Sequence, residues 1–227
     1  MKVRNLNLSG FAIAGSLVLI GATALDPADT QAGILRDIMV SAGLSKPKPA
    51  TATEAAARGL PRRGFACCNL HYKHDWINDA NYAELPMISV GTPMEVQSYG
   101  KDRAYVTIDG RPMRLGHDYG RDQESLQAWV EKIVVTTDPK PRLASWPKPI
   151  QDAIYEGKIV IGMTRDQAIA SVGYPLTSEN VSLNQPTWRV WRSSQGEYDL
   201  NWRQDGRLGS VTGNEEVTKL MLFQPAH

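Results

Sequence analysis

Cysteine, histidine and phenylalanine are rare in this chain: its 227 residues include two cysteines, four histidines and three phenylalanines. The chain also lacks a large net charge, because its 25 basic residues nearly balance its 24 acidic ones. A protein without a basic excess has little of the electrostatic attraction on which nucleic-acid binding depends. We therefore expect no nucleic-acid partner.

The common catalytic signatures are missing too. The sequence has no Gly-x-Ser-x-Gly elbow, no His-Glu-x-x-His, no phosphate-binding loop and no dinucleotide fingerprint. The cysteines are adjacent, so a Cys-x-x-Cys redox motif is absent as well. These absences favour a binding protein over an enzyme, and we expect no cofactor.

Both cysteines and two histidines nevertheless fall within eight positions, as Cys67, Cys68, His71 and His74. Thiolates and imidazoles are ligands that Zn²⁺ and copper prefer, so a metal site or a thiol site is one hypothesis, with His117 as a further member. The spacing matches no established metal motif, and a disulfide between neighbours requires a strained peptide. The alternatives are buried small side chains or bonds to another chain.

The N-terminus predicts export. Lys2 and Arg4 precede an apolar stretch, and small residues at 22–24 form a cleavage site before Leu25. Residues 1–24 are therefore interpreted as a signal peptide, which places the protein in the periplasm or at the outer-membrane periphery. The alternative is an uncleaved inner-membrane anchor. We favour cleavage because the strongly apolar part is shorter than a membrane span.

Residues 25–64 show no sustained core pattern and are predicted to be a flexible linker. A second linker is expected at 138–149, where four prolines are unfavourable inside a regular element. These two linkers divide the chain into domains at 65–137 and 150–214. The tail, 215–227, is either a last turn of helix or a frayed end.

The C-terminal domain is predicted to consist of a short helix followed by three strands. Thr164 and Gln167 form a capping box, Ala168, Ile169 and Val172 give an apolar stripe, and Gly173 ends the helix. Downstream, residues 187–193, 197–203 and 208–212 alternate as strands joined by tight turns. We expect the short helix to pack on one face of this antiparallel sheet.

The order Gly162-Met163-Thr164, Gln167, Gly173-Tyr174-Pro175 and a strand led by Trp188 resembles the SmpA/OmlA (BamE-like) domain family. Members of this family are small accessory lipoproteins of outer-membrane β-barrel assembly. The resemblance covers roughly 158–214 and implies an α+β fold with a short helix on a three-stranded sheet. Leu25 stands where those lipoproteins carry a cysteine, so a lipid anchor is not expected at that position.

The middle of the chain is predicted to be β-rich. Residues 93–99, 103–108 and 111–115 alternate in polarity, and Asp109-Gly110 is a tight-hairpin signal. A helix should follow, capped by Asp122, with an apolar stripe ending at Ile133. This block resembles the bacterial SH3-like domains of cell-envelope proteins, which implies a small, strongly bent sheet.

The resulting hypothesis is a non-enzymatic adaptor that binds envelope or outer-membrane proteins. Its candidate contacts are aromatic and arginine side chains of the C-terminal sheet, namely Arg189, Trp191 and Trp202. An alternative is a module that binds peptidoglycan or lipid through loops of the SH3-like block, at Trp76, Tyr82, His117 and Tyr119. His117 stands beside an aspartate, but a hydrogen-bonded loop is favoured over acid–base chemistry because no partner nucleophile is recognisable.

Overall fold

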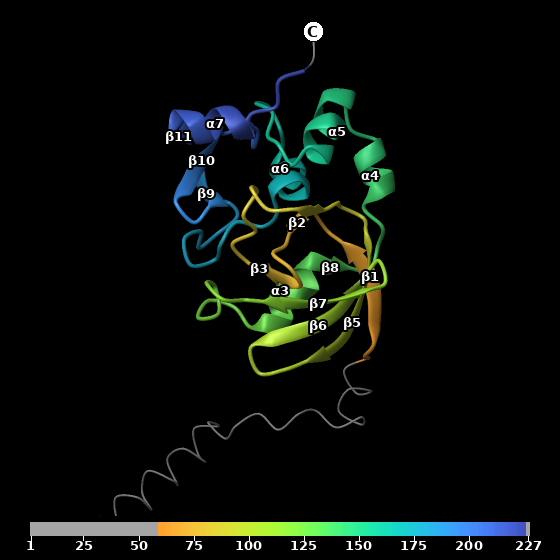
Figure 1. The fold of residues 1–227 in the computed structure, drawn as a ribbon. Coiled ribbons are helices and arrows are strands. Elements are labelled where there is room, and N and C mark those ends of the chain that lie inside the picture. Colours follow the sequence, from red (N-terminus) through yellow and green to blue (C-terminus); the bar gives the residue numbers. More distant parts are fainter. Residues whose placement is uncertain (1–58, 226–227) are drawn as a thin grey trace, which may run out of the picture. The chain divides into compact units, whose positions relative to one another are not determined.

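The computed structural model describes residues 59–225, which belong to one compact unit (Figure 1). The predicted signal peptide and most of the first linker lie outside the described residues. The architecture is α+β, with a curled six-stranded sheet, a three-stranded antiparallel sheet and several short helices, as the sequence predicted at this coarse level.

The six-stranded sheet is built from the N-terminal half of the described chain. In spatial order its strands are β3 (Trp76–Asn78), β7 (Arg111–Gly116), β6 (Arg103–Ile108), β5 (Pro93–Tyr99), β1 (Arg62–Ala66) and β8 (Val134–Val135). All pairs are antiparallel except β3 with β7. A separate two-stranded ladder joins β2 (Leu70–His71) to β4 (Met87–Ile88).

The hairpin between β6 and β7 forms where the sequence predicted it. Asp109 and Gly110 both adopt positive φ, 47° and 77°, as a primed two-residue turn requires. The turn places Val106 opposite Met113, and both side chains are buried. Alternation along these strands therefore fills one face of the sheet with apolar residues.

Helix α3 (Leu126–Ile133) covers this apolar face. Trp129, Val130 and Ile133 are buried, so the predicted stripe is confirmed. The predicted cap is wrong: Ser125, not Asp122, caps the helix by accepting a hydrogen bond from the Ala128 N–H. Both residue types are good caps, and the sequence alone did not distinguish the two starts.

The C-terminal half contains the second sheet and four helices. Its strands, in spatial order, are β11 (Leu208–Gly213), β10 (Gly196–Trp202) and β9 (Thr187–Ser193), and its helices are α4 (Lys140–Ala144), α5 (Lys148–Tyr155), α6 (Arg165–Val172) and α7 (Glu215–Met221). The predicted strands are confirmed to within one residue at their ends.

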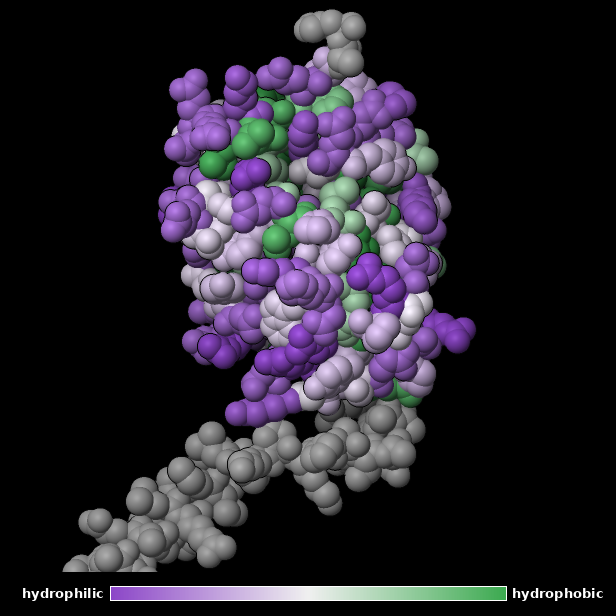
Figure 2. Space-filling model, viewed as in Figure 1, coloured by the Kyte–Doolittle hydropathy of each residue, from purple (hydrophilic) through white to green (hydrophobic). Residues whose placement is uncertain are grey.

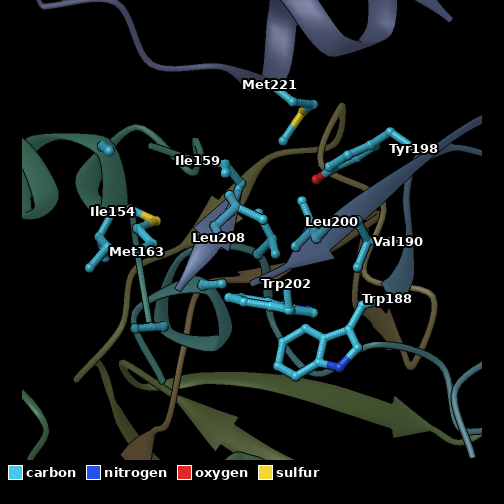
Figure 3. Close-up of a cluster of buried hydrophobic side chains, with 14 of the residues drawn as sticks. Ile154, Ile159, Met163, Trp188, Val190, Tyr198, Leu200, Trp202, Leu208 and Met221 are labelled. Atoms are coloured by element: carbon cyan, nitrogen blue, oxygen red, sulfur yellow. The ribbon is translucent and has the colours of Figure 1, made fainter. Parts of the chain in front are cut away.

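One face of the three-stranded sheet forms a core with the surrounding helices (Figure 3). Trp188 and Trp202 meet edge to face, with ring centroids 4.6 Å apart, and Tyr198 and Leu200 are buried beside them. Met163 and other residues of the α6 region belong to the same cluster. Ala168, Ala170 and Val172 of α6 thus share one hydrophobic cluster with this sheet.

Helix α6 has the predicted capping box. The Thr164 hydroxyl accepts from the Gln167 N–H, and the Gln167 side chain accepts from the Thr164 N–H. At the other end Gly173 has φ 83°, and a Cβ there would lie 2.4 Å from the Asn81 amide nitrogen. The helix therefore ends against a segment of the N-terminal half.

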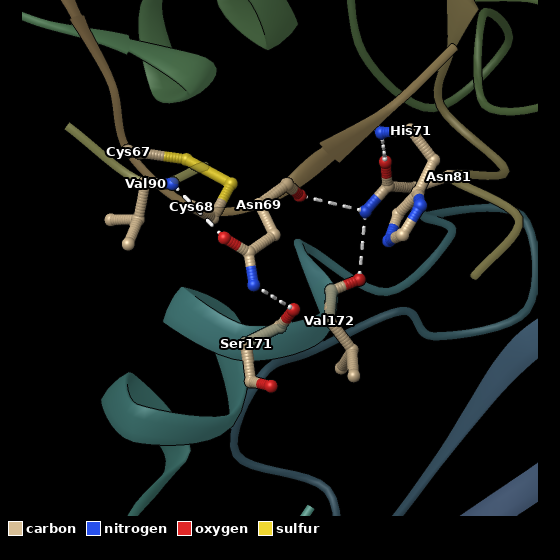
Figure 4. Close-up of a disulfide and its surroundings, with 8 residues drawn as sticks. All are labelled: Cys67, Cys68, Asn69, His71, Asn81, Val90, Ser171 and Val172. Atoms are coloured by element: carbon tan, nitrogen blue, oxygen red, sulfur yellow. Dashed lines mark hydrogen bonds between the residues drawn. A yellow bond between two sulfur atoms is a disulfide. The ribbon is translucent and has the colours of Figure 1, made fainter. Parts of the chain in front are cut away.

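Two buried asparagines join the halves (Figure 4). The Asn69 amide donates to the carbonyls of Ile154 and Ser171, and Asn81 donates to the carbonyl of Val172. Two backbone bonds continue the junction, from Ala83 and Glu84 to the edge of β9. Because these groups are buried, each needs its partner from the opposite half.

Several segments differ from the predicted linkers and loops. Residues 62–64 belong to β1 rather than to the first linker. The expected connector at 138–149 holds helix α4 and the start of α5, with Leu143 buried. Its prolines are accommodated because they stand at the first positions of these helices, where a missing N–H costs little. Helix α7 forms in the predicted tail, with Asn214 as its cap.

Polar residues dominate the face drawn in Figure 2, and hydrophobic residues appear there in small separate areas. Across the part of the chain that the structure describes, no helix has both the length and the apolar character needed to cross a bilayer.

Candidate functional site

An aromatic surface forms where the loop before β4, the loop after β7 and the sheet edge at β9 come together. We define this aromatic surface as Tyr82, Tyr119, Glu179 and Trp191. The Tyr82 hydroxyl donates to the Tyr119 hydroxyl at 3.4 Å, and the Trp191 indole N–H donates to the Glu179 carboxylate at 2.9 Å. Tyr119 is 49% exposed, and Tyr82 and Trp191 are half-buried.

The Tyr82 phenol of this surface is protonated at neutral pH. Burial, the hydrogen bond that Tyr82 donates to Tyr119 and the nearby charges of Asp79 and Glu179 raise the pKa of Tyr82 to about 12. The Tyr82 hydroxyl and the Trp191 indole N–H both donate within the surface, so what it presents to a partner is aromatic ring area.

Asp79 holds the adjacent loop in place. Its buried carboxylate accepts from the backbone N–H groups of Asp118, Tyr119 and Gly120. His117 lies beside it, 5% exposed, with its Nε2 3.4 Å from the carboxylate and its ring stacked on Trp129. This loop therefore positions Tyr119, and His117 is removed from the candidate ligand-binding residues because its ring is buried in packing.

The predicted protein-binding residues separate into two groups. Trp202 is only 8% exposed and packs on Trp188, so its assignment as a surface contact is wrong. Arg189 is exposed, but its guanidinium is held by Asp199 through two hydrogen bonds. Trp191, on the same strand face as Arg189, is the member that remains available for a partner.

Trp76 contacts different residues from those that contact Tyr82. Its ring has the guanidinium of Arg103 at 4.9 Å and that of Arg114 at 5.3 Å from its centroid. Arg114 also pairs with Asp75 through two bonds of 2.7 Å, which lowers the pKa of that carboxyl. The indole is therefore already flanked by the chain's own cations.

The structure does not bring the four residues of the predicted cysteine–histidine cluster together as metal ligands. Cys67 and Cys68 are joined as a disulfide between neighbours, so neither thiolate is available. His71 is buried, with its Nδ1 2.8 Å from the Leu85 carbonyl oxygen, whereas His74 is exposed. Within residues 59–225 no group of three or more histidine, cysteine or carboxylate side chains is arranged to hold a metal ion.

A cavity of about 500 Å³ lies between the halves, and we call it the interface cavity. It is bounded by β1, β8 and the residues after it, α4 and α6, and its lining includes Arg62, Cys67, Thr136, Leu143, Trp146 and Ile169. This volume falls within the ~300–1,000 Å³ typical of small-molecule sites. The lining residues are mostly apolar.

Sequence reasoning missed both Glu179 and the interface cavity. Glu179 stands in a polar loop whose only signal was its place shortly before a tryptophan-bearing strand. The cavity joins residues more than one hundred positions apart, so no local pattern could have indicated it. Comparison with known family models, curated proteins and solved structures finds no match for this chain.

Proposed function

We propose that this protein is a non-enzymatic adaptor of the cell envelope that binds other envelope proteins through the aromatic surface. The observation that carries the proposal is that two hydrogen-bonded pairs, Tyr82 with Tyr119 and Trp191 with Glu179, come together from segments far apart in the sequence. The Ala83 N–H donates to the Trp191 carbonyl, and the charge of Glu179 acts on Tyr82. Aromatic side chains supply much of the binding energy at protein interfaces. Envelope location rests on the predicted signal at 1–24.

Two features support recognition without chemistry. The His117 ring that suggested acid–base catalysis is buried against Trp129 and beside Asp79, whose carboxylate anchors a loop. The packing of α6 with the three-stranded sheet is also the arrangement expected of an SmpA/OmlA-like domain, and the curled sheet is compatible with an SH3-like block. A family relationship to assembly accessory proteins remains part of this proposal.

The test is a crosslinking pull-down of the full chain from cells, comparing the wild type with Trp191→Ala and Tyr119→Ala. Recovery of specific envelope proteins should fall at least tenfold in both variants. Tyr155→Ala is the matched control, because Tyr155 is 54% exposed on α5 and is not part of the aromatic surface. Equal recovery by all four proteins would refute the assigned surface.

Sedimentation with purified peptidoglycan distinguishes the second candidate function. A protein adaptor should stay in the supernatant. Pelleting of the wild type that is lost in Tyr119→Ala would favour a glycan-binding module at the same surface.

A further inference from the structure

We propose that the aromatic surface binds an arginine side chain of the protein partner, with the guanidinium on the Trp191 ring and in contact with the Glu179 carboxylate. This inference rests on the proposed adaptor function and names the feature of the partner that the surface recognises. Three features of the molecule support it: the cations over its other tryptophans, the charges around Trp191 and the closed edge of β9.

Trp191 differs from the other five tryptophans of the chain in what covers its ring. Four of them have a guanidinium over the ring, with its central carbon between 4.8 and 5.8 Å from a ring centroid. These four are Trp76, Trp146, Trp188 and Trp202. The fifth, Trp129, stacks on the imidazole of His117. Within residues 59–225 no cation covers Trp191 or either tyrosine of the aromatic surface, so these rings are open to a cation from outside.

The bases on the strand of Trp191 are already paired. Arg189 donates two hydrogen bonds to the carboxylate of Asp199. The Nη1 of Arg192 lies 3.6 Å from a carboxylate oxygen of Glu84. Each arginine therefore has an acid within the molecule, and neither lies over the Trp191 ring.

Two acids beside Trp191 lack such a partner. Glu179 accepts from the Trp191 indole N–H at 2.9 Å, and Glu197 stands directly opposite Trp191 in the register of β9 and β10. Both are exposed, and among the described residues neither forms an ion pair with a base. The negative charge left at the surface is complementary to a cation. A guanidinium fits best, because it stacks on an aromatic ring and donates to a carboxylate at the same time.

The edge of β9 is closed to an added strand. The Ala83 N–H donates to the Trp191 carbonyl. The Asn180 side chain accepts from the Arg189 N–H and donates to the Arg189 carbonyl. Because these backbone groups are satisfied, a partner is recognised here by the side chains that point outward from the sheet rather than by pairing with its edge.

The first experiment is an NMR titration of the full chain, isotope-labelled at its tryptophan indoles, with three short peptides. The peptides are otherwise uncharged and differ at one central residue, which is arginine, lysine or citrulline. Citrulline has nearly the shape of arginine but no charge. The Trp191 indole signal is identified by its absence in Trp191→Phe.

The arginine peptide should shift the Trp191 indole signal saturably and bind at least tenfold more tightly than the citrulline peptide. The lysine peptide should bind more weakly than the arginine peptide, because an ammonium lacks the planar face that stacks on the ring. The proposal is overturned if the arginine peptide causes no saturable shift, or if either of the other peptides binds as tightly.

A pair of variants tests the role of the carboxylate. Glu179→Gln keeps an acceptor for the indole N–H but removes the charge, so it should weaken binding of the arginine peptide at least tenfold. Glu216→Gln is the matched control, because Glu216 is an exposed carboxylate on α7 and is not part of the aromatic surface. It should bind the peptide as the wild type does. Equal affinities in the two variants would contradict the proposal.

The crosslinking pull-down separates this inference from the adaptor function. Recovery of envelope proteins should fall in Glu179→Gln as it does in Trp191→Ala. Loss in Trp191→Ala with full recovery in Glu179→Gln would refute recognition of an arginine and leave the adaptor function standing. Equal recovery by both variants and the wild type would refute the adaptor function and, with it, the partner's arginine.

Discussion

Buried polar residues such as Asn69 connect the two halves of this protein through hydrogen bonds. Asn69 is fully buried, its amide donates to Ile154 and Ser171, and its side-chain oxygen accepts from the Val90 N–H. Its backbone N–H also donates to Ala170. One side chain therefore satisfies three buried backbone groups on segments that are distant in sequence, a role that no hydrophobic residue of this size can perform.

Asn69→Ala should lower the free energy of unfolding by roughly 3 kcal/mol or more, because each buried group left unpaired costs about 1–3 kcal/mol. Urea denaturation measures the change. The matched control is Asn184→Ala, at an exposed loop position, which should alter stability by less than about 0.5 kcal/mol. Similar small effects at both positions would mean that water replaces the lost amide.

His71 predicts a dependence of stability on pH. Burial lowers the pKa of its ring, against a smaller opposing effect of the Leu85 carbonyl, and its Nε2 has no partner. The unfolded chain therefore binds a proton more readily than the folded one. Stability is fully present above the unfolded pKa of about 6.5 and is lost as the pH falls through the lower, folded value.

Urea denaturation between pH 7.5 and pH 5 should show this loss in the wild type and a smaller loss in His71→Gln. His74→Gln is the control, because His74 is exposed and its variant should follow the wild type. A pH profile that is identical in all three proteins would show that another group controls the response.

At the scale of elements, the sequence correctly predicted those features that depend only on neighbouring residues. The capping box of α6 and the turn at Asp109-Gly110 both formed because each needs only neighbouring residues. Strand β1 was missed, since its glycine and arginines give no apolar alternation and it forms only by pairing with β5 and β8. Such long-range pairing overrides weak local preference.

Thr164→Ala should reduce the free energy of unfolding by about 1 kcal/mol, since it removes the acceptor that satisfies the Gln167 N–H at the helix start. Thr164→Ser keeps the hydroxyl and should retain most of that stability. Thermal unfolding of the two variants provides the comparison. An equal loss in both would assign the effect to the threonine methyl group rather than to the cap.

At the scale of the whole molecule, the sequence could predict an α+β chain, strands β5, β6 and β7 of the curled sheet and the strands of the second sheet, but not the junction between the halves. Trp191 and Trp202 illustrate the limit for the candidate site. Both were predicted to be surface contacts, but the observed register places them on opposite faces of the sheet, and which face is covered depends on α6 and its neighbours. The interface cavity has the same origin, because it exists only after both halves have folded.

The junction predicts that the described chain unfolds as one cooperative unit. Separating the halves would break three hydrogen bonds, from Asn69 to Ala170, from Asn81 to Val172 and from Glu84 to Arg192. Water pairs with these groups once the halves separate, so each lost bond costs about 0.5–1.5 kcal/mol net. Ile169 also packs against both hydrophobic clusters, so separation exposes apolar surface as well, and the combined loss is a large part of the stability of a small domain.

Native-state hydrogen exchange tests this prediction on the full chain. The slowest amides of β6 and β10, which lie in different sheets, should give free energies of opening that agree within about 1 kcal/mol. The same amides should diverge in Asn69→Ala, in which the junction is weakened. Two separate values in the wild type would instead mean that each half is stable alone, with the boundary near 138–149 acting as a true domain linker.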